Sequence, residues 1–331
     1  MSNKQQLGAI GLDIGGTKIA AGVVLWPSGE IAHHKLIPTI PARGGEAVLK
    51  DTVDLARQLH DWAQTEGIEV AGIGAGVAEL VDCDGNVTSS CTIQWRDVPV
   101  QQRLSEIAPS QVESDVRTGA LAEASFAAGQ GHHLFVFITV GTGISYSLVQ
   151  DGVPFKGANG NAILMASSPL STVCTQCGAA LHPVLEEFAS GPAIARRFVE
   201  ARPSSENTGM PRDACTAKDV FRVASQGNKA AADILTSAGE ALGVSMAFLV
   251  NILDPEVIVV GGGLGLAGGL YWEAFERACR AHIFADNSCG LPIIAAKLGV
   301  EAGLVGAAAT VFQSGPFRKI KPQQTQDQLH R

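Results

Sequence analysis

The segment from Ile10 to Leu25 interrupts an apolar strand pattern with the residues Asp-Ile-Gly-Gly-Thr-Lys. Adjacent glycines weaken a strand interior, and they usually mark a bulge, a turn or a close approach to the backbone. A purely structural strand gains nothing from Gly15 and Gly16. The pattern therefore predicts a turn that another chemical group approaches closely.

Two later segments repeat this combination of strand and glycine turn. Leu134 to Val149 reads as strand, Gly-Thr-Gly turn and strand, and Asn251 to Gly265 reads as a strand that ends in three glycines. Any two hairpins look alike, but the third turn favours an internal duplication that gives two similar lobes. Three glycine turns at strand ends are typical of a nucleotide held between two lobes.

The two common single-loop nucleotide sites are absent from the sequence. A Rossmann site needs GxGxxG with an acidic residue about 20 positions later, and a P-loop needs GxxxxGK[ST]; the chain meets neither pattern. The glycine turns therefore do not belong to either of these sites.

Other elements must position the turns. Apolar spacing predicts a helix over 47–64 and a buried strand over 69–77. A strand over 111–115 ends in the carboxylate of Asp115, and an Ala- and Leu-rich helix over 118–129 follows it. The chain is thus expected to be an α/β protein with a carboxylate at a strand end.

Composition limits the class of protein. The 331 residues are 46% hydrophobic, which suits about two domains, and the formal net charge of −8 argues against nucleic-acid and anionic-membrane partners. The polar start MSNKQQ lacks the pattern of a signal peptide, and the apolar runs are too short to span a bilayer. We expect a cytoplasmic protein whose seven cysteines are mostly reduced thiols.

Six motifs in order resemble those of the ROK family of bacterial sugar kinases and sugar-responsive repressors. They are DIGGTK (13–18), ESD (113–115), ITVGTG (138–143), KGANGNA (156–162), EEFASG (186–191) and NILDPEVIVVGGGLG (251–265). The resemblance implies a two-lobed actin-like or ribonuclease H-like ATPase fold with duplicated βββαβα lobes. It places an N-terminal lobe at 1–117 plus about 307–331 and a C-terminal lobe at 118–306. It also implies a homodimer.

The resemblance implies ATP and Mg²⁺ as cofactors of phosphoryl transfer. Asp13 would hold Mg²⁺ directly or through water, and Lys18 would add a positive charge near the phosphates. The remaining nucleotide contacts would come from the glycine turns. They are Gly15, Gly16, Thr17, Gly141, Thr142, Gly143, Gly262 and Gly263.

Asp115 matches the family aspartate that accepts a proton from the sugar hydroxyl, so the resemblance implies that it is the catalytic base. A helix N-cap at the start of the following helix is an alternative role for the same carboxylate. The substrate-binding residues that the resemblance implies are Ser114, Asp115, Asn159, Asn161 and Glu186. An exposed helical carboxylate is the alternative for Glu186.

The sugar-contacting motifs depart from the family pattern. Leu164 stands in the place of a family glutamate and Ser167 in the place of a histidine, Ser114 replaces an asparagine, and Ala78-Glu79 replaces an upstream Pro-Gly pair. Loss of the glutamate leaves sugar hydroxyls without a partner, which costs about 1 to 3 kcal/mol for a buried group. The departures favour an amino sugar or a cyclitol as substrate, or the loss of sugar phosphorylation.

The family also suggests a structural zinc ion. Cys174, Cys177 and His182 have a spacing close to that of family zinc ligands, but Ser167 stands where a histidine ligand is expected, so the fourth ligand is undefined. Free thiols in a loop are the alternative.

Three functions remain open from the sequence. The first is ATP-dependent phosphorylation of a primary hydroxyl on an amino sugar or cyclitol, and the second is a kinase for a common hexose or N-acetylhexosamine. The third is a non-catalytic sugar- or nucleotide-responsive binding protein. The retained DIGGTK motif and Asp115 favour an active kinase.

Overall fold

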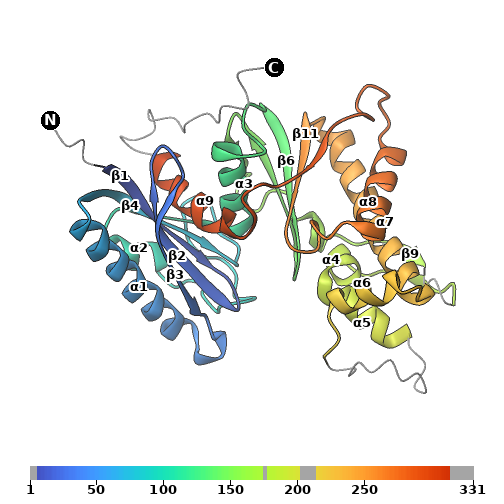
Figure 1. Cartoon of the computed structure of the whole chain (residues 1–331), viewed down its shortest axis with the longest axis horizontal. Coiled ribbons are helices and arrows are strands. Elements are labelled where there is room, and N and C mark those ends of the chain that lie inside the picture. The colour runs from blue at the N-terminus through green and yellow to red at the C-terminus, as the bar shows by residue number, and fades with distance from the viewer. Residues whose placement is uncertain (1–5, 174–176, 202–213, 314–331) are drawn as a thin grey trace. The chain divides into compact units, whose positions relative to one another are not determined.

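The computed structural model describes residues 6–173, 177–201 and 214–313 (Figure 1). Contacts between Cα atoms divide the chain into two compact units. Among the described residues, unit 1 comprises 6–134, 147–162 and 296–313, and unit 2 comprises 135–146, 163–173, 177–201 and 214–295. The lobe limits predicted from the sequence, residue 117 and about residue 307, stay predictions.

The first sheet has five strands in the order β3-β2-β1-β4-β5. They are β1 (Gln6–Ile14), β2 (Lys18–Leu25), β3 (Ile31–Pro38), β4 (Ile68–Val77) and β5 (Ser110–Ser114). β1, β2 and β3 are antiparallel neighbours, whereas β4 runs parallel to both β1 and β5. The carboxyl ends of β1, β4 and β5 therefore meet at one edge of the sheet.

The second sheet repeats this topology with the order β12-β11-β6-β7-β8. Its strands are β6 (Leu134–Val140), β7 (Ile144–Gln150), β8 (Val153–Pro154), β11 (Val257–Gly261) and β12 (Ile293–Ala295). β6 takes the place of β1, because it lies between the antiparallel meander and the parallel pair β11 and β12. This repeat is the duplication that the glycine turns predicted.

Helices cover both faces of the first sheet. α1 (Gly45–Thr65) and α2 (Val100–Ser105) belong to a hydrophobic core with Ile10, Leu12 and Ile14 of β1. α3 (Asp115–Phe126) and α9 (Ala302–Thr310) pack together, and α9 also lies on β1 and β4. A Cβ at Gly74 would lie 1.7 Å from the carbonyl oxygen of Ala307. Glycine in β4 thus permits close packing of α9 on the sheet, which is a structural use of glycine.

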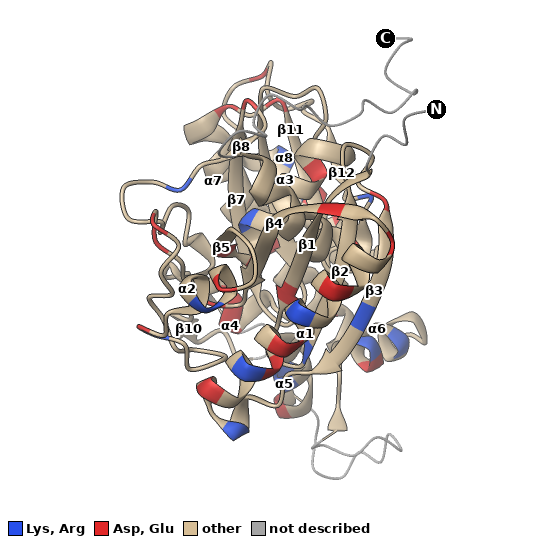
Figure 2. Ribbon diagram, turned by 90° about the vertical axis from the view of Figure 1, so that its left-hand side faces the viewer, with Lys and Arg blue, Asp and Glu red and all other residues tan. Residues whose placement is uncertain are grey.

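The exposed side of α1 carries charges of both signs. Figure 2 shows acidic and basic residues interspersed along this helix, and Lys50 and Asp54 form an ion pair of 2.7 Å there. Such interspersed charges do not form the basic stripe that a nucleic acid requires.

In unit 2 the long helix α7 (Lys229–Leu253) packs closely on α8 (Gly269–His282). Cβ atoms at Gly239 and Gly243 would clash with carbonyl oxygens of α8, at 2.3 and 2.4 Å, so the two glycines allow the short separation. α7 is long and apolar enough to cross a membrane by composition, but 61% of its most apolar window is buried in the protein. This burial is typical of a core helix.

The remaining elements are short. They are α4 (Leu185–Ala189), α5 (Gly191–Ala201), α6 (Ala217–Ser225), β9 (Thr172–Val173), β10 (Ala180–Leu181), and the 3-10 helices η1 (Pro41–Arg43), η2 (Met165–Ser167), η4 (Gly299–Glu301) and η5 (Val311–Gln313).

One boundary differs from the sequence-based expectation, because α3 begins at Asp115 instead of residue 118. Of the three consecutive glycines, Gly261 ends β11, and Gly262 and Gly263 begin the loop over 262–268 that leads to α8. The polar tail expected to fray over 317–331 lies outside the described residues.

Candidate active site

Three carboxylates gather where the parallel strands of the first sheet end. The register pairs Ile14 with Val77 and Val77 with Ser114, so β1, β4 and β5 finish side by side. Asp13 lies one residue before the end of β1, and Asp115 follows the end of β5 directly. Glu79, two residues beyond β4, is the third acidic residue at this edge. The sheet topology thus assembles acidic groups that lie far apart in the sequence.

The glycine turn between β1 and β2 is held by backbone and side-chain hydrogen bonds. The Gly15 amide donates to the Lys18 carbonyl oxygen at 3.0 Å, and the buried Thr39 hydroxyl donates to the Gly15 carbonyl oxygen at 2.6 Å. Among the residues that the structure describes, the amides of Gly16 and Thr17 donate no hydrogen bond. A fixed turn with two unused amides is suited to an anionic ligand.

Asp13 is half-buried behind this turn. Its carboxylate contacts Gly303 in the first turn of α9, where a Cβ would lie 2.5 Å from the carboxyl carbon. Burial raises the pKa of Asp13 to about 6, against the opposing charge of Lys18. No hydrogen-bond donor in the described part of the chain reaches this carboxylate. Its oxygens are available to a hard cation such as Mg²⁺.

Asp115 is the first residue of α3, and Ser114 occupies the N-cap position. The Val116 amide donates to the Asp115 carboxylate at 2.7 Å. Although water reaches this side chain, desolvation by the surrounding protein raises its pKa to about 6, and the negative charge of Asp13 adds to the increase. Such a pKa lies close to the range useful for a general base at neutral pH.

Ser114 is buried beside this carboxylate. Its hydroxyl is one of two buried side-chain polar atoms, among the described residues, that have no hydrogen-bond partner. Since buried polar groups in proteins are nearly always paired, an unpaired hydroxyl next to Asp115 calls for an explanation.

A buried ion network anchors the segments around Asp115. Arg117 binds Glu113 through its Nε and donates to the carbonyl oxygens of Val81 at 2.7 Å and Gly160 at 2.5 Å. Lys156 pairs with the second oxygen of Glu113 at 2.9 Å. Arg117 thus joins three chain segments at the edge where Asp115 lies.

Sequence reasoning missed the part played by Arg117. The spacing of Glu113 and Arg117, four residues apart, is that of a helical ion pair and was the available signal. That signal does not reveal burial or the contacts to distant carbonyl groups, because these depend on the tertiary structure.

The loop over residues 156–162 leaves its two asparagines exposed. Asn159 and Asn161 face solvent in unit 1, and the backbone of Gly160 between them is fixed by Arg117. A Cβ at Gly160 would lie 2.2 Å from the Val81 carbonyl oxygen, so this position requires glycine. The loop is anchored at its centre while both amide side chains remain accessible.

Unit 2 contains the second glycine turn and Glu186. The Gly141 amide donates to the Gly143 carbonyl oxygen at 2.9 Å, and the Glu186 carboxylate accepts from the Ile144 amide at 2.8 Å. A Cβ at Gly143 would lie 2.7 Å from Glu186. Glu186 therefore supports the turn that contains Thr142, instead of extending freely from an exposed helix.

The third turn packs on the second. Gly262 has φ +82°, and a Cβ there would lie 2.3 Å from the Val140 carbonyl oxygen, so only glycine fits without displacement. The space beside Gly263 is empty, because a Cβ built there would have no atom within 4 Å. The Gly263 amide nitrogen in turn would lie 4.0 Å from a Cβ built at Gly141. The two turns of unit 2 form one continuous backbone surface.

The proposed zinc ligands are only partly described. Cys177 is an exposed free thiol, and the ring of His182 lies 3.4 Å from the Ser171 hydroxyl, whereas Cys174 lies outside the described residues. Within the described ranges, no group of three or more His, Cys, Asp and Glu side chains could hold a metal ion. The described residues do not complete a tetrahedral zinc site.

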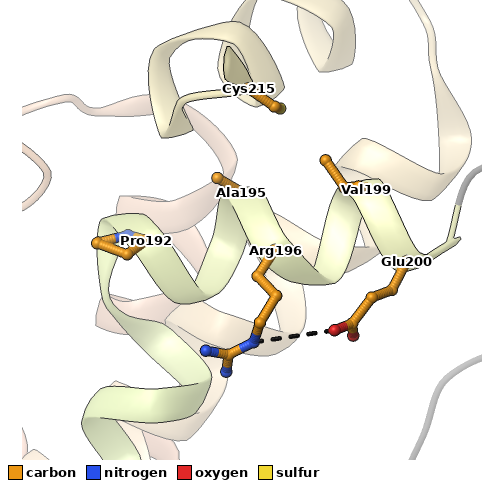
Figure 3. Close-up of a pocket in the computed structure, with 6 residues that line it drawn as sticks. All are labelled: Pro192, Ala195, Arg196, Val199, Glu200 and Cys215. Atoms are coloured by element: carbon orange, nitrogen blue, oxygen red, sulfur yellow. Dashed lines mark ion pairs between the residues drawn. The ribbon is translucent and has the colours of Figure 1, made fainter. Parts of the chain in front are cut away.

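A separate pocket in unit 2 has a volume of about 390 Å³ (Figure 3). Its lining residues come from α5 and from Cys215, and Arg196 and Glu200 form a long ion pair of 4.0 Å at its rim. None of the residues predicted to bind nucleotide or sugar lines this pocket, so it is distinct from the site built on the glycine turns.

Known proteins are similar to this chain over nearly its whole length. The model of the ROK family matches residues 9–314. A glucokinase from Halalkalibacterium halodurans is 30% identical over 320 residues, which cover 92% of this chain and 94% of that protein. A bifunctional NanE/NanK enzyme from Brucella melitensis is 30% identical over 312 residues, which cover 92% of this chain and 54% of that protein.

Solved structures agree with these relatives. The ROK family glucokinase from Streptomyces griseus, solved in complex with glucose and AMPPNP, has a TM-score of 0.76 and 29% identity. That match covers 93% of this chain and 100% of the other. The family, the actin-like α/β fold and the class of ATP-dependent carbohydrate kinase predicted from the sequence are confirmed.

Proposed function

Because the chain belongs to the ROK family, we propose that it transfers a phosphoryl group from ATP to a primary hydroxyl of a hexose-like sugar. The observation that carries this proposal is the arrangement of Asp13, Asp115 and the unused amides of the Gly15–Thr17 turn in one unit. Phosphoryl transfer needs hydrogen-bond donors that bind the phosphates, a ligand for the metal ion and a group that orients the acceptor hydroxyl. These three requirements correspond to the turn, Asp13 and Asp115.

Asp115 would accept the proton of the sugar hydroxyl as that oxygen attacks the γ-phosphorus. The carboxylate is accessible, and its raised pKa makes it a stronger base than an ordinary aspartate while it remains mostly ionised above pH 6. Asp13 would hold Mg²⁺, which neutralises charge on the phosphate oxygens when it is bound. Lys18 is exposed beside the turn and would add positive charge there.

In the same proposal, Gly141, Thr142 and Gly143 would contact phosphates, and Gly262 and Gly263 would contact the adenosine portion. The open backbone around Gly263 supports this role. Asn159, Asn161 and Glu186 would bind the sugar. Glu186 would do so while it also holds the Gly143 turn through the Ile144 amide.

For the acceptor we favour an amino sugar or a cyclitol. Leu164 is exposed and offers no hydrogen-bonding group where the family has a glutamate. A site without that carboxylate suits an acceptor that differs at this position, as an amino sugar or a cyclitol would.

A common hexose or N-acetylhexosamine is the second candidate acceptor. The 30% identity to a glucokinase and to a NanE/NanK enzyme over nearly the whole chain supports it. A site without the glutamate should bind these sugars weakly, so the two candidates differ in the expected KM.

We also propose that the protein is a cytoplasmic homodimer. Val244, Phe248 and Ile252 are spaced four residues apart on α7, and their side chains are 40%, 59% and 59% exposed. A helical stripe of exposed apolar residues supports burial against a second copy. Light scattering should give the mass of a dimer, and Phe248→Asp should convert it to a monomer; a monomeric wild type would contradict the proposal.

The experiment that tests the function is a coupled ADP-release screen with Mg-ATP. The panel contains glucose, N-acetylmannosamine, 3-amino-3-deoxyglucose and C7-cyclitols, and a reaction without acceptor measures background ATP hydrolysis. Turnover that depends on one acceptor class establishes the kinase and its substrate. Binding of Mg-ADP without turnover on any acceptor would instead support a non-catalytic binding protein.

A further inference from the structure

Glu79 is a buried carboxylate that the proposed chemistry does not use. Only 6% of the residue is exposed, and it follows β4 at the same sheet edge as Asp13 and Asp115. A buried ionised group requires several hydrogen bonds to remain stable. The contacts of this carboxylate therefore indicate what it does.

In the described part of the chain, every hydrogen bond to the Glu79 carboxylate comes from one segment, residues 89–93. The Ser89 hydroxyl donates to one carboxylate oxygen. Backbone amides donate the other hydrogen bonds: Cys91 at 2.9 Å, Thr92 at 2.6 Å and Ile93 at 2.7 Å. Burial alone would raise the pKa of Glu79, but these four donors together lower it. The carboxylate is thus ionised and holds three consecutive amides.

The segment that Glu79 holds lies directly on the glycine turn. A Cβ built at Gly16 would be 2.6 Å from the Cγ2 methyl of Thr92, so this methyl fills the space that any larger residue would need. Ile93, the last residue bound by Glu79, is completely buried in the core under α1. Thr92 therefore supports the turn from an anchored position.

We propose that Glu79 is a positioning residue of the active site: it holds residues 89–93 so that Thr92 supports the Gly15–Thr17 turn, and it contributes a fixed negative charge to the environment of Asp115. Support of the turn affects the binding of the nucleotide phosphates, and the negative charge affects Asp115, the proposed base for the acceptor hydroxyl. This inference rests on the proposed kinase function. Glu79 does not itself need to contact substrate.

The charges that act on Asp115 define the expected electrostatic effect. Desolvation and the charge of Asp13 from β1 raise the pKa of Asp115 most, Arg117 from α3 lowers it, and Glu79 from the segment after β4 makes the smallest contribution, which raises it. Arg117 is itself neutralised by Glu113. Removing the charge of Glu79 should therefore lower the pKa of Asp115, an effect that a purely structural role in the loop would not require.

Four proteins separate the two effects: wild type, Glu79→Gln, Thr92→Ser and the matched control Glu69→Gln. Glu69 lies in β4, the strand that precedes Glu79, and is exposed. Thr92→Ser removes the methyl over Gly16 but leaves Glu79 and its backbone contacts in place. The measurements are hydrogen exchange of residues 91–93, the ¹³C titration of the Asp115 carboxyl and the Kd of Mg-ADP.

In Glu79→Gln we expect amide exchange at 91–93 to accelerate by about tenfold or more, the Asp115 pKa to fall, and the Kd of Mg-ADP to rise by roughly fivefold. Thr92→Ser should raise the Kd without moving the Asp115 pKa. Glu69→Gln should match wild type in all three readouts.

Unchanged exchange at 91–93 together with an unchanged Asp115 titration in Glu79→Gln would overturn the inference. If Glu79→Gln does not fold, Ser89→Ala replaces it, because this variant removes one hydrogen-bond donor to Glu79. Amide exchange at 91–93 should then accelerate in Ser89→Ala, and unchanged exchange would overturn the inference. Failure of the wild-type protein to bind Mg-ADP would contradict the proposed function and not the role of Glu79. Hydrogen exchange at 91–93 and the titration of Asp115 would still test that role.

Discussion

Asp13, one residue before the end of β1, and Asp115, directly after β5, lie at one edge of the first sheet, and desolvation together with the negative charge of Asp13 raises the pKa of Asp115. Both carboxylates have a pKa of about 6 in the absence of bound ligand. The site is therefore prepared for a cation, because a metal ion between or near these groups would favour their ionised forms.

The first prediction concerns the pH dependence of activity. A general base must be ionised, so kcat/KM should decrease as the pH falls through about 6, where Asp115 takes up a proton. Asp13→Asn removes a repulsive charge and should lower the Asp115 pKa, measured by ¹³C NMR in nucleotide-free protein. An Asp115 pKa that stays at its wild-type value in Asp13→Asn would show that the two carboxylates are not coupled.

The second prediction concerns stability. A folded-state pKa above the unfolded value means that Asp115 contributes stability when protonated, below about pH 4, and that this contribution is lost as the pH rises through about 6. Asp115→Asn removes the ionised form and should raise Tm at pH 7.5, by a small amount because water screens this exposed side chain. The difference from wild type should shrink towards zero at pH 4. Equal Tm values at pH 7.5 would contradict the raised pKa.

The third prediction tests the buried network of Arg117. Arg117→Ala leaves the Glu113 carboxylate with Lys156 and the Ser114 amide and deprives two carbonyl oxygens of their donor, so it should cost about 3 to 5 kcal/mol in the free energy of unfolding. The control is Arg103→Ala, because Arg103 pairs with Glu106 at 3.6 Å on the surface and should cost about 0 to 1 kcal/mol. Urea unfolding measures both. Similar losses in the two variants would rule out an anchoring role for Arg117.

The fourth prediction uses the backbone of Ile163, which has φ +60° although its side chain is β-branched. Such a conformation costs about 1 to 3 kcal/mol. Ile163→Gly should relieve it and be more stable to urea than Ile163→Ala, which removes the same side chain but keeps the unfavourable φ. The usual order, with alanine more stable than glycine, would contradict the strained conformation.

Much of the fold could be predicted from periodicity and glycine placement. The helix expected over 47–64 is α1 at 45–65, and the repeated hairpins correspond to two sheets of the same topology. The start of α3 was missed by three residues, because the Ala- and Leu-rich pattern begins only after Arg117. Local sequence patterns thus predicted the presence of helices and strands more reliably than the residues at which they begin and end.

The role of Glu79 could not be predicted from its position alone. Its four donors come from residues 89–93, and only the folded path of that segment places them around one carboxylate. Glycines were also ambiguous: Gly16 lies at a turn, whereas Gly74 lies in a strand where a helix packs closely. The sequence does not distinguish these two uses, since both depend on neighbours that are distant along the chain.

The most direct test of the account is single-turnover phosphoryl transfer from Mg-ATP to the responding sugar, measured in wild type and Asp115→Asn together with the Kd of Mg-ADP. If Asp115 is the catalytic base, the variant should lose about 10² to 10⁴ in rate while the Kd changes less than about twofold. A rate close to that of wild type, on a sugar that wild type phosphorylates, would contradict the assignment of Asp115 and the mechanism built on it.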